Sequence, residues 1–320
     1  MLFDTFIEQL PLKVFQDNHI SYGKKLGEGG NAEVYKLTVD NHEYAGKIYE
    51  NPNLEDILSE LEVAKKLENT KQCVKTYGIL VSDNDGKIII LMELLKSYGD
   101  LYDYTSNIAK WTACYRIGNS KELFPKPKSN YVYFNKDENT YWCYELSEKQ
   151  KIRITMSLVK AVQELHKNGI IHGDIKTNNM VLHYLYKKQI IKLIDFGMSY
   201  FSDTEEMIDI EYKCGTLGYR APEQEEYQMN YKSDIYSMAA TIIEMWNGDI
   251  WMDGESFREC RKELLCGLRK LEKNNKELGN LLRKSLSLDH KKRPTAERFV
   301  STLKKIISNN DHKYKNNLQV

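Results

Sequence analysis

The spacing of apolar residues changes along the chain from a strand-like pattern to a helical one. In the N-terminal part, three stretches have the composition of strands separated by turns: ISYGKKLGEGG, NAEVYKLTV and, after DNH, EYAGKIY. A fourth stretch, KIIILMELL, is apolar enough for a buried strand. Between them, LEDILSELEVAKKLEN places on one helical face Ile57, Glu60, Ala64 and Leu67. These patterns predict a small antiparallel sheet with one amphipathic helix.

The helical pattern takes over at Ser147. Ser147 and Gln150 form a capping-box pattern, and the helix that it begins is expected to bury Ile154 and Leu158 and to stop at Gly169. Downstream, IIKLIDFG has the pattern of a strand entering a turn, and SDIYSMAATIIEMW that of a buried helix. Further helices are expected to about residue 308. This part of the chain is therefore predicted to form a larger, mainly helical lobe.

Three segments lie outside these patterns. Residues 1–20 form an N-terminal extension with helical spacing at Leu2, Phe3, Phe6, Ile7 and Leu10. Residues 311–320 are a polar tail that is expected to be frayed. Residues 105–145 form an insertion far longer than an ordinary loop, and its many aromatic residues predict an ordered segment. Those aromatics either form a docking site for a protein partner or pack against the larger lobe.

Composition excludes several classes of function. Lysine plus arginine equals aspartate plus glutamate, at 46 each, so nucleic acid and anionic membranes are not expected as partners. The first residues lack the pattern of a secretory signal, and no apolar run is long enough to span a bilayer. Six cysteines without a CxxC pair favour free thiols, also at Cys114 and Cys143, and an intracellular protein, cytoplasmic or nuclear.

A glycine-rich turn is the first candidate for chemistry. The stretch GEGGNAEV places Gly27, Gly29, Ala32 and Val34 on a strand, a turn and a second strand. Such a turn lets backbone amides approach phosphate oxygens, and the flanking strands distinguish it from the dinucleotide fingerprint, which opens a helix. The pattern indicates a phosphate-binding loop, and an ordinary hairpin with glycines is the alternative.

A lysine in a strand predicted to be half buried is the second candidate. The ammonium of Lys47, in AGKIY, needs an acidic partner, because burying an unpaired charge is costly. Glu62 can pair with Lys66 on a solvated helix face, whereas Glu60 shares the apolar face of the same helix. We therefore predict that Lys47 pairs with Glu60.

Two further motifs carry the side chains that phosphoryl transfer requires. Asp174, Lys176 and Asn179 have the spacing D-x-K-x-x-N, and Asp195 opens DFG. Transfer of a phosphoryl group needs an oxygen that positions the attacking hydroxyl, a positive charge at the moving phosphoryl group, and oxygen ligands for Mg²⁺. These four side chains provide all three.

Taken in order, the motifs resemble those of the eukaryotic protein kinase family, serine/threonine type. The resemblance runs from about Ile20 to Ile307 and includes the glycine loop, AGKIY, HGDIKTNN, DFG, GTLGYRAPE, SDIYSMAATIIEM and DHKKRPTA. It implies an α+β, two-lobed fold, with a kinase domain over residues 21–310, an N-lobe at about 21–95 and a C-lobe at about 96–310. It also implies ATP and Mg²⁺ as cofactors and protein substrates phosphorylated on serine or threonine.

The resemblance implies a catalytic role for each residue of these motifs. Lys47 would hold the inner phosphates of ATP and pair with Glu60. Asp174 would accept or orient the substrate hydroxyl, and Lys176 would stabilise the transferring phosphoryl group. The metal ligands would be Asn179 and Asp195.

The resemblance also implies the remaining nucleotide contacts and two structural anchors. The contacts would come from Leu26, Gly27, Gly29, Val34, Ala45, Met92, Glu93, Leu95, Asp100 and Val181. Glu223 would form an ion pair with Arg293. Asp234 would anchor the catalytic loop from its helix.

Gly173 is the main departure from the family pattern, because an arginine usually stands at this position. Small-molecule kinases of the aminoglycoside and choline type also carry H-G-D, which makes them one alternative. GTLGYRAPE, with Glu223 and Arg293, resembles the peptide-docking segment of protein kinases and favours a protein substrate. A pseudokinase scaffold is the other alternative, and the complete set of transfer residues argues against it.

The missing arginine also bears on regulation. In many kinases the arginine at this position binds a phosphate on the activation segment, which glycine cannot do. Here the segment MSYFSDTEEMIDIEYK is already acidic, so an added phosphate would meet like charge. We therefore expect activity that does not depend on phosphorylation of this segment.

Overall fold

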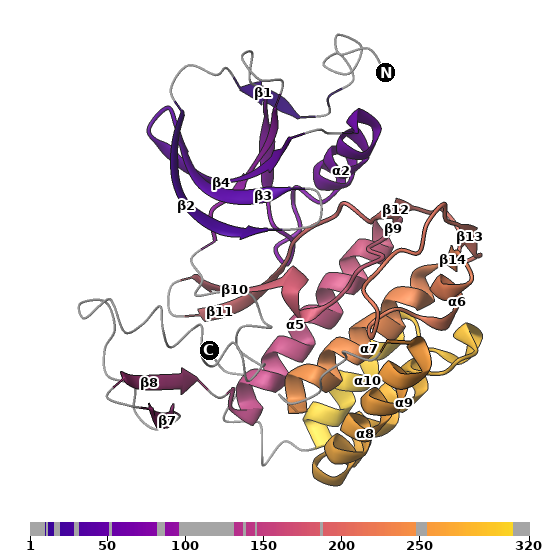
Figure 1. Ribbon diagram of the computed structural model, residues 1–320. Coiled ribbons are helices and arrows are strands. Elements are labelled where there is room, and N and C mark those ends of the chain that lie inside the picture. The colour runs from indigo at the N-terminus through magenta and orange to yellow at the C-terminus, as the bar shows by residue number, and fades with distance from the viewer. Residues whose placement is uncertain are drawn as a thin grey trace. The chain divides into compact units, whose positions relative to one another are not determined.

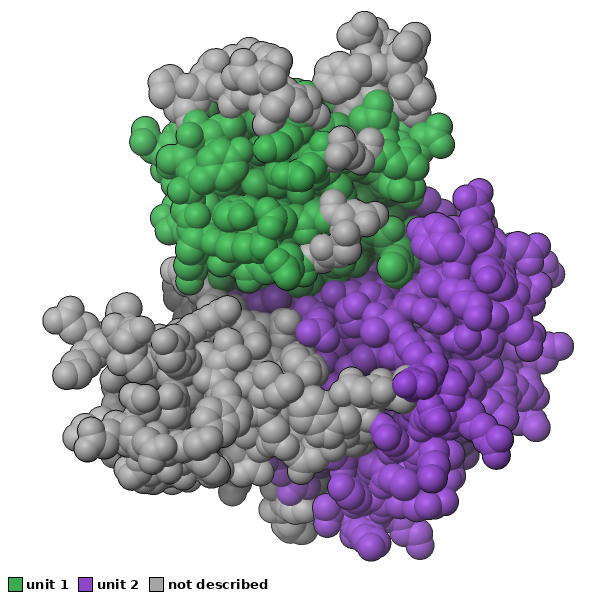
Figure 2. Space-filling model, in the orientation of Figure 1, with its two compact units in different colours: residues 1–96, 194–199 green, residues 97–193, 200–320 purple. Residues whose placement is uncertain are grey.

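The computed structural model describes residues 10, 12–15, 20–28, 32–50, 53–81, 87–95, 131–136, 139–144, 146–185, 188–247 and 255–309. The chain divides into two compact units, one of residues 1–96 and 194–199 and the other of residues 97–193 and 200–320 (Figure 2). The first unit is built on a β-sheet and the second mainly on helices (Figure 1). The predicted α+β fold is confirmed.

The sheet of the first unit has six strands in the order β1-β5-β6-β4-β3-β2. Their bounds are β1 Lys13–Phe15, β2 Ile20–Glu28, β3 Glu33–Val39, β4 His42–Tyr49, β5 Thr76–Val81 and β6 Ile88–Glu93. β1 pairs with β5 in parallel, and the other pairs are antiparallel. The two-residue turn between β3 and β4 holds Asp40 and Asn41, both with positive φ, as a type I′ hairpin turn requires.

Helix α2 (Leu54–Lys66) packs against this sheet (Figure 1). Asn53 caps its start by accepting the N–H of Glu55 at 3.0 Å. Ile57 and Leu61 join the core formed with Ile79, Ile88 and Ile90, and each such buried side chain contributes about 1.5–3 kcal/mol. The predicted helical face is confirmed, because all four of its residues are buried.

The described part of the N-terminal extension includes a strand that the sequence interpretation did not predict, whereas the expected helical spacing lies almost entirely outside the described residues. Lys13–Phe15 form strand β1, in which Val14 pairs with Ile79 of β5, while Leu10 and Leu12 pack against the core under α2. An edge strand exposes unpaired N–H and C=O groups, and the pairing of β1 with β5 satisfies such groups on both strands. Leu2, Phe3, Phe6 and Ile7 lie outside the described residues.

The second unit is built around two long helices, α5 (Glu148–Lys167) and α7 (Tyr231–Asn247). The capping box is confirmed, because the N–H of Ser147 donates to Gln150 Oε1 at 3.0 Å and that of Gln150 to Ser147 Oγ at 3.4 Å. α7 is buried continuously from Ser233 to Met245, which confirms the buried helix. The other helices in the described part of this unit are α6 Pro222–Glu225, α8 Phe257–Asn274, α9 Lys276–Ser285 and α10 Ala296–Asn309, with 3-10 turns η1 Thr177–Asn179 and η2 His290–Lys292.

Short antiparallel strand pairs complete the second unit. They are β9 Ile170–Ile171 with β12 Tyr200–Phe201, β10 Met180–Leu185 with β11 Lys188–Leu193, β13 Ile208–Asp209 with β14 Gln228–Met229, and β7 Tyr131–Lys136 with β8 Asn139–Tyr144. The β7–β8 hairpin belongs to the aromatic insertion, whose other residues lie outside the described part of the chain. The docking role of the insertion stays a prediction.

Two sequence expectations concern cysteines and membranes. Cys73, Cys214, Cys260 and Cys266 are all free thiols, as predicted. The side chains of Cys114 and Cys143 lie outside the described residues. Within the described ranges, none of the helices combines the length and the apolar character that crossing a bilayer would require.

Candidate active site

The register of the first sheet places several predicted nucleotide-binding residues on one face. Val34 lies opposite Lys47 across β3 and β4, and Ala45 lies opposite Met92 across β4 and β6. Opposite residues of antiparallel strands share a face and side chains alternate along a strand, so all four side chains project to the same side. Gly27 adjoins this row opposite Val34 on β2.

The other predicted nucleotide contacts are dispersed. Leu26 lies on β2 with an exposed side chain, and Glu93 ends β6, where its N–H donates to Lys75 O at 2.8 Å. Leu95 follows two residues later, and Val181 belongs to β10 of the second unit. Gly29 and Asp100 lie outside the described residues. The nucleotide-binding role of all these residues stays a prediction.

Lys47 pairs with Glu60, as the sequence predicts. Its Nζ lies 2.8 and 3.0 Å from the two carboxylate oxygens of Glu60 and 2.9 Å from Oδ1 of Asp195. Glu62 is exposed on the other side of α2. Burial by itself lowers the pKa of Lys47, but the charges of Glu60 and Asp195 more than compensate, so the pKa lies well above its ordinary value. The ammonium therefore stays charged and fixed in place.

Tyr49 is a third member of this cluster that the sequence interpretation missed. Its hydroxyl donates to Glu60 Oε2 at 2.6 Å, and Lys47 Nζ lies 5.2 Å from the centre of its ring. Burial, and then the negative charge of Glu60, raise the pKa of Tyr49, so its hydroxyl remains a donor. Its position two residues after Lys47, on the same strand face, is the signal that could have identified it.

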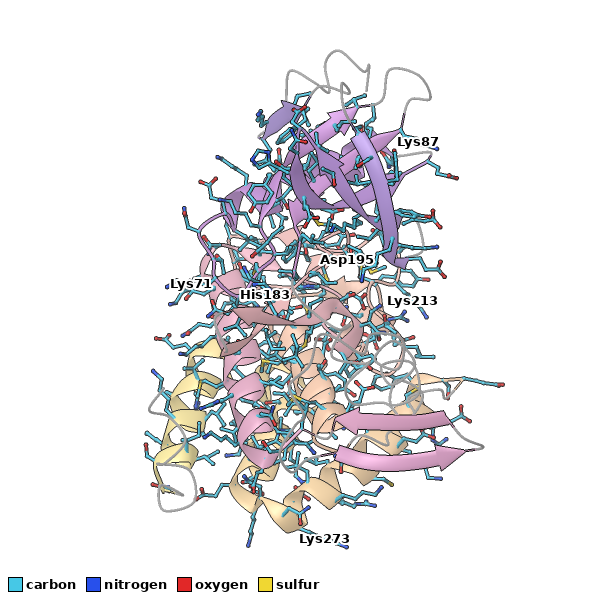
Figure 3. The ribbon with its side chains drawn as sticks, turned by 90° about the vertical axis from the view of Figure 1, so that its left-hand side faces the viewer. Lys71, Lys87, His183, Asp195, Lys213 and Lys273 are labelled. Atoms are coloured by element: carbon cyan, nitrogen blue, oxygen red, sulfur yellow. The ribbon has the colours of Figure 1, made fainter. Side chains whose placement is uncertain are left out.

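Asp195 has an unusual backbone conformation. Its φ of +63° lies in the left-handed region, which costs free energy for any residue other than glycine. Its side chain, labelled in Figure 3, is 45% exposed while one oxygen binds Lys47. An outlier of this kind is typical of a functional position held by its surroundings.

In the second unit, Asp174 is the centre of the cluster that contains the predicted catalytic residues. Its Oδ1 accepts the N–H and the hydroxyl of Thr216, both at 2.8 Å. Its Oδ2 lies 2.8 Å from Lys176 Nζ, which also donates to Thr216 Oγ1 at 2.6 Å. Asp174 is buried, so these bonds hold its carboxylate in one orientation.

Asn179 completes this cluster. Its Nδ2 donates to the backbone oxygen of Asp174 at 2.9 Å and to its Oδ2 at 3.0 Å. Because both bonds use the amide nitrogen, the amide oxygen is the atom that could ligate a hard cation. The other predicted metal ligand, Asp195, belongs to the first unit. Among the described residues there is no cluster of three histidine, cysteine or acidic side chains that could hold a metal by itself.

Asp234, buried on α7, holds the loop that carries Asp174. Its carboxylate accepts the N–H groups of His172 at 2.8 Å and Gly173 at 3.0 Å, and it also lies 3.0 Å from His166 Nε2. The predicted anchor is present. Gly173 has a φ of +80°, where a side chain costs roughly 1–2 kcal/mol, so the backbone itself favours glycine at this position.

The predicted ion pair between Glu223 and Arg293 is also present. The guanidinium of Arg293 donates to both oxygens of Glu223, at 2.6 and 2.8 Å, and Ser233 Oγ donates to Glu223 Oε1 at 2.6 Å. Arg293 further donates to Ser287 O and Lys232 O. The pair joins helix α6 to the segment after η2, which fixes the end of GTLGYRAPE.

Glu244 is the centre of a buried hydrogen-bond network beside the Asp174 cluster. The sequence interpretation missed this network. Glu244 of α7 accepts the hydroxyl of Tyr219 at 2.6 Å and that of Thr177 at 2.9 Å. Tyr219 belongs to GTLGYRAPE, and Thr177 to the catalytic loop. No local pattern marks the network, because its three members are far apart in the sequence.

The sequence also matches a known protein family. The family described as "Protein kinase domain" matches residues 20–303. The chain belongs to the protein kinase family.

Several curated relatives of this kinase domain carry serine/threonine kinase names. It is 24% identical over 99% of its length to "Probable serine/threonine-protein kinase gdt4" of Dictyostelium discoideum. It is 32% identical over 50% of its length to "Serine/threonine-protein kinase kin-29" of Caenorhabditis briggsae, and 30% identical over 49% to "Serine/threonine-protein kinase ppk16" of Schizosaccharomyces pombe. The chain spans 18%, 19% and 23% of the lengths of these three relatives.

Proposed function

We propose that this kinase domain transfers the γ-phosphoryl group of ATP to serine or threonine hydroxyls of protein substrates. The observation that carries the proposal is the cluster in which Asp174, Lys176 and Thr216 contact one another directly. This cluster places a carboxylate, a cation and a hydroxyl within hydrogen-bond distance of one another. Lysine at position 176 and threonine at position 216 also resemble the residues of serine/threonine protein kinases. The names of the curated relatives support the same type.

The donor set of the chain fits ATP and Mg²⁺. Lys47 offers a fixed ammonium to phosphate oxygens, while Asp195 and Asn179 offer a carboxylate and an amide oxygen, which are ligands that Mg²⁺ prefers. When bound, Mg²⁺-ATP supplies the phosphoryl group and offsets its charge. Asp174 would orient the substrate hydroxyl and accept its proton, and Lys176 would bring positive charge to the oxygens of the transferred group.

The ordered end of GTLGYRAPE favours a protein over a small molecule as acceptor. Glu223 and Arg293 tie this segment down, and Tyr219 is bonded to Glu244 within the same unit. Small-molecule kinases, which share H-G-D, lack a segment that resembles it. A pseudokinase scaffold is the alternative without catalysis, and the intact cluster around Asp174 argues against it.

A labelling experiment tests the proposed function. Purified protein is incubated with labelled ATP and Mg²⁺ beside a panel of peptides and a panel of small alcohols. We expect label on serine or threonine of peptides. Label on small alcohols alone would support the aminoglycoside or choline kinase alternative, and label on neither class would support the pseudokinase.

The described activation segment also supports activity without phosphorylation. Thr204 and Tyr212 are exposed among acidic residues, and the nearby cation Lys213, labelled in Figure 3, already pairs with Glu225 at 3.1 Å. The activation segment is held by contacts that require no phosphate. They include the β9–β12 and β13–β14 pairs and the bond from Asn230 Nδ2 to Glu205 O at 2.9 Å.

Dephosphorylated enzyme is therefore expected to keep its peptide kinase activity. Initial rates are compared before and after phosphatase treatment, and again for a Thr204→Ala, Tyr212→Phe variant that cannot be phosphorylated at the two exposed positions. Rates within about twofold are expected. A loss of tenfold or more, about 1.4 kcal/mol in the activation free energy, would show that a phosphate is required after all.

Two finer expectations belong to the same proposal. The free thiols of Cys73, Cys214, Cys260 and Cys266 support a reducing compartment, cytoplasmic or nuclear. A protein partner at the aromatic insertion stays a hypothesis that rests on its composition.

A further inference from the structure

Gln224 is a fully buried polar side chain in the short helix α6. Burying an amide costs free energy unless its N–H and C=O groups find partners. The partners of a completely buried amide therefore reveal what it holds together.

The Gln224 amide bonds to the start of its own helix and to two other segments of the chain. Its Oε1 accepts the N–H of Ala221 at 2.9 Å, which closes the first turn of α6. Its Nε2 donates to Gly173 O at 3.0 Å and to Cys214 O at 3.2 Å. The amide orientation is unambiguous, because an N–H needs the oxygen and two carbonyls need the nitrogen. One side chain thus joins α6 to the catalytic loop and to the activation segment.

The two carbonyls that Gln224 binds stand beside the residues of the catalytic cluster. Gly173 immediately precedes Asp174, and Cys214 lies two residues before Thr216. Asp174 and Thr216 are bonded to each other. The contacts therefore form a closed ring in which Gln224 bonds one side and the Asp174–Thr216 pair bonds the other.

The centre of this ring is tightly packed. Gly215 has a φ of +86°, and a Cβ at this position would lie 2.8 Å from Gly173 O and 3.2 Å from Gln224 Nε2. The ring therefore closes only around a glycine. Arg220 supports it from outside, since its Nη2 and Nε donate to Gly215 O at 2.6 and 3.2 Å and its Nη1 to Glu225 at 2.8 Å.

We propose that Gln224 is a positioning residue for phosphoryl transfer, which holds the activation segment to the catalytic loop so that Thr216 stays bonded to Asp174. It provides without phosphorylation the connection that an arginine at position 173 and a phosphate would otherwise make. This inference rests on the proposed kinase activity and names the side chain that makes activity independent of the segment's phosphorylation.

Gln224→Met tests the role, because methionine is close to glutamine in size but donates no hydrogen bond to Gly173 O or Cys214 O. We expect kcat to fall at least tenfold while KM for ATP stays within about threefold. Gln224→Glu is the second variant: it keeps the acceptor for the Ala221 N–H, and hence the turn of α6, but it cannot donate to both carbonyls, because a carboxyl group has at most one O–H. The same loss of kcat is expected.

Asn275→Ala is the matched control. Asn275 is also a buried amide, and it accepts the Leu278 N–H at 3.1 Å at the start of α9. Loss of such a cap costs typically about 1 kcal/mol of stability. We expect this variant to unfold more easily than wild type but to keep its kcat, which separates positioning from general destabilisation.

Hydrogen exchange provides a readout that needs no turnover. In dephosphorylated wild type, the backbone amides of residues 214–217 are expected to exchange far more slowly than those of the exposed residues 203–206. The Gln224→Met substitution is expected to speed up exchange at 214–217. The amides of α7 are expected to stay protected in this variant. Equal exchange of the two stretches in wild type, or a kcat of Gln224→Met within twofold of an active wild type, would overturn the positioning role alone. A wild type that transfers no label contradicts the proposed function, and this role with it.

Discussion

Replacing Asp174 by asparagine is expected to lower kcat by about 10² to 10⁴ fold, the usual contribution of a positioned general base. Asparagine has the same shape and can still accept the bonds from Thr216, but it cannot accept a proton from the substrate hydroxyl. Nucleotide affinity is expected to change by less than about threefold, because Lys47 and Glu60 are untouched. Steady-state kinetics with a peptide substrate and a separate nucleotide titration measure the two quantities.

Asp289→Asn is the control for this substitution. Asp289 is an exposed aspartate that caps η2 and lies 3.7 Å from Lys292. Its replacement is expected to leave both kcat and nucleotide affinity unchanged. An Asp174→Asn enzyme that keeps full kcat would exclude Asp174 as the base and would defeat the proposed mechanism.

Replacing Arg293 by methionine is expected to lower the free energy of unfolding by about 3–5 kcal/mol, the cost of leaving one partner of a buried ion pair alone. Glu223 would keep only the hydroxyl of Ser233 as a side-chain donor. Arg283→Met is the control, because Arg283 makes a similar pair with Glu272 but is 49% exposed, and such pairs contribute about 0–1 kcal/mol. Denaturant unfolding of both variants measures the difference, and equal losses would contradict the role assigned to burial.

The effect of Arg293→Met on the free energy of unfolding is also expected to depend on pH. Burial raises the pKa of Glu223, but the hydrogen bonds and charge of Arg293 outweigh burial, and the net pKa lies below its ordinary value. A carboxyl group whose pKa is lowered by folding stabilises the protein above its unfolded pKa, and this contribution is lost as the pH falls through the lowered pKa. The stability difference between wild type and Arg293→Met is therefore expected to shrink on acidification, and a constant difference would argue against a charged pair.

Local patterns in the sequence correctly predict those helices and contacts that depend on residues close together in the chain. The capping box at Ser147 starts α5, and the apolar spacing of α2 and α7 correctly identifies their buried faces. The choice of Glu60 over Glu62 also followed from helical periodicity, because only Glu60 lies on the face that is turned to the sheet. The spacing of the catalytic motifs predicted the cluster of Asp174, Lys176 and Asn179 for a similar reason, since all three lie on one short loop.

Contacts between distant segments could not be predicted in this way. β1 was not predicted, because its three residues are too few for a recognisable pattern and it pairs with β5, more than 60 residues later in the chain. The strand β5 itself, TYGILV, was not predicted, because its apolar run is short and only its neighbours β1 and β6 decide its conformation.

Residue types at short, regular spacings were enough to recognise the protein kinase family, most of the strands around α2, the helices α2, α5 and α7, and the candidate side chains for phosphoryl transfer. The sequence also pointed to Glu60 and Asp234 as groups that hold these side chains in position, but Thr216 and Gln224 were identified only from the folded structure. Gln224 binds two backbone carbonyls, and a carbonyl has the same chemistry in every residue, so no sequence pattern marks its partners. Gly173 is similar, because the sequence does not show that its backbone adopts a left-handed conformation. The folded structure shows both this conformation and the bond from its N–H to Asp234.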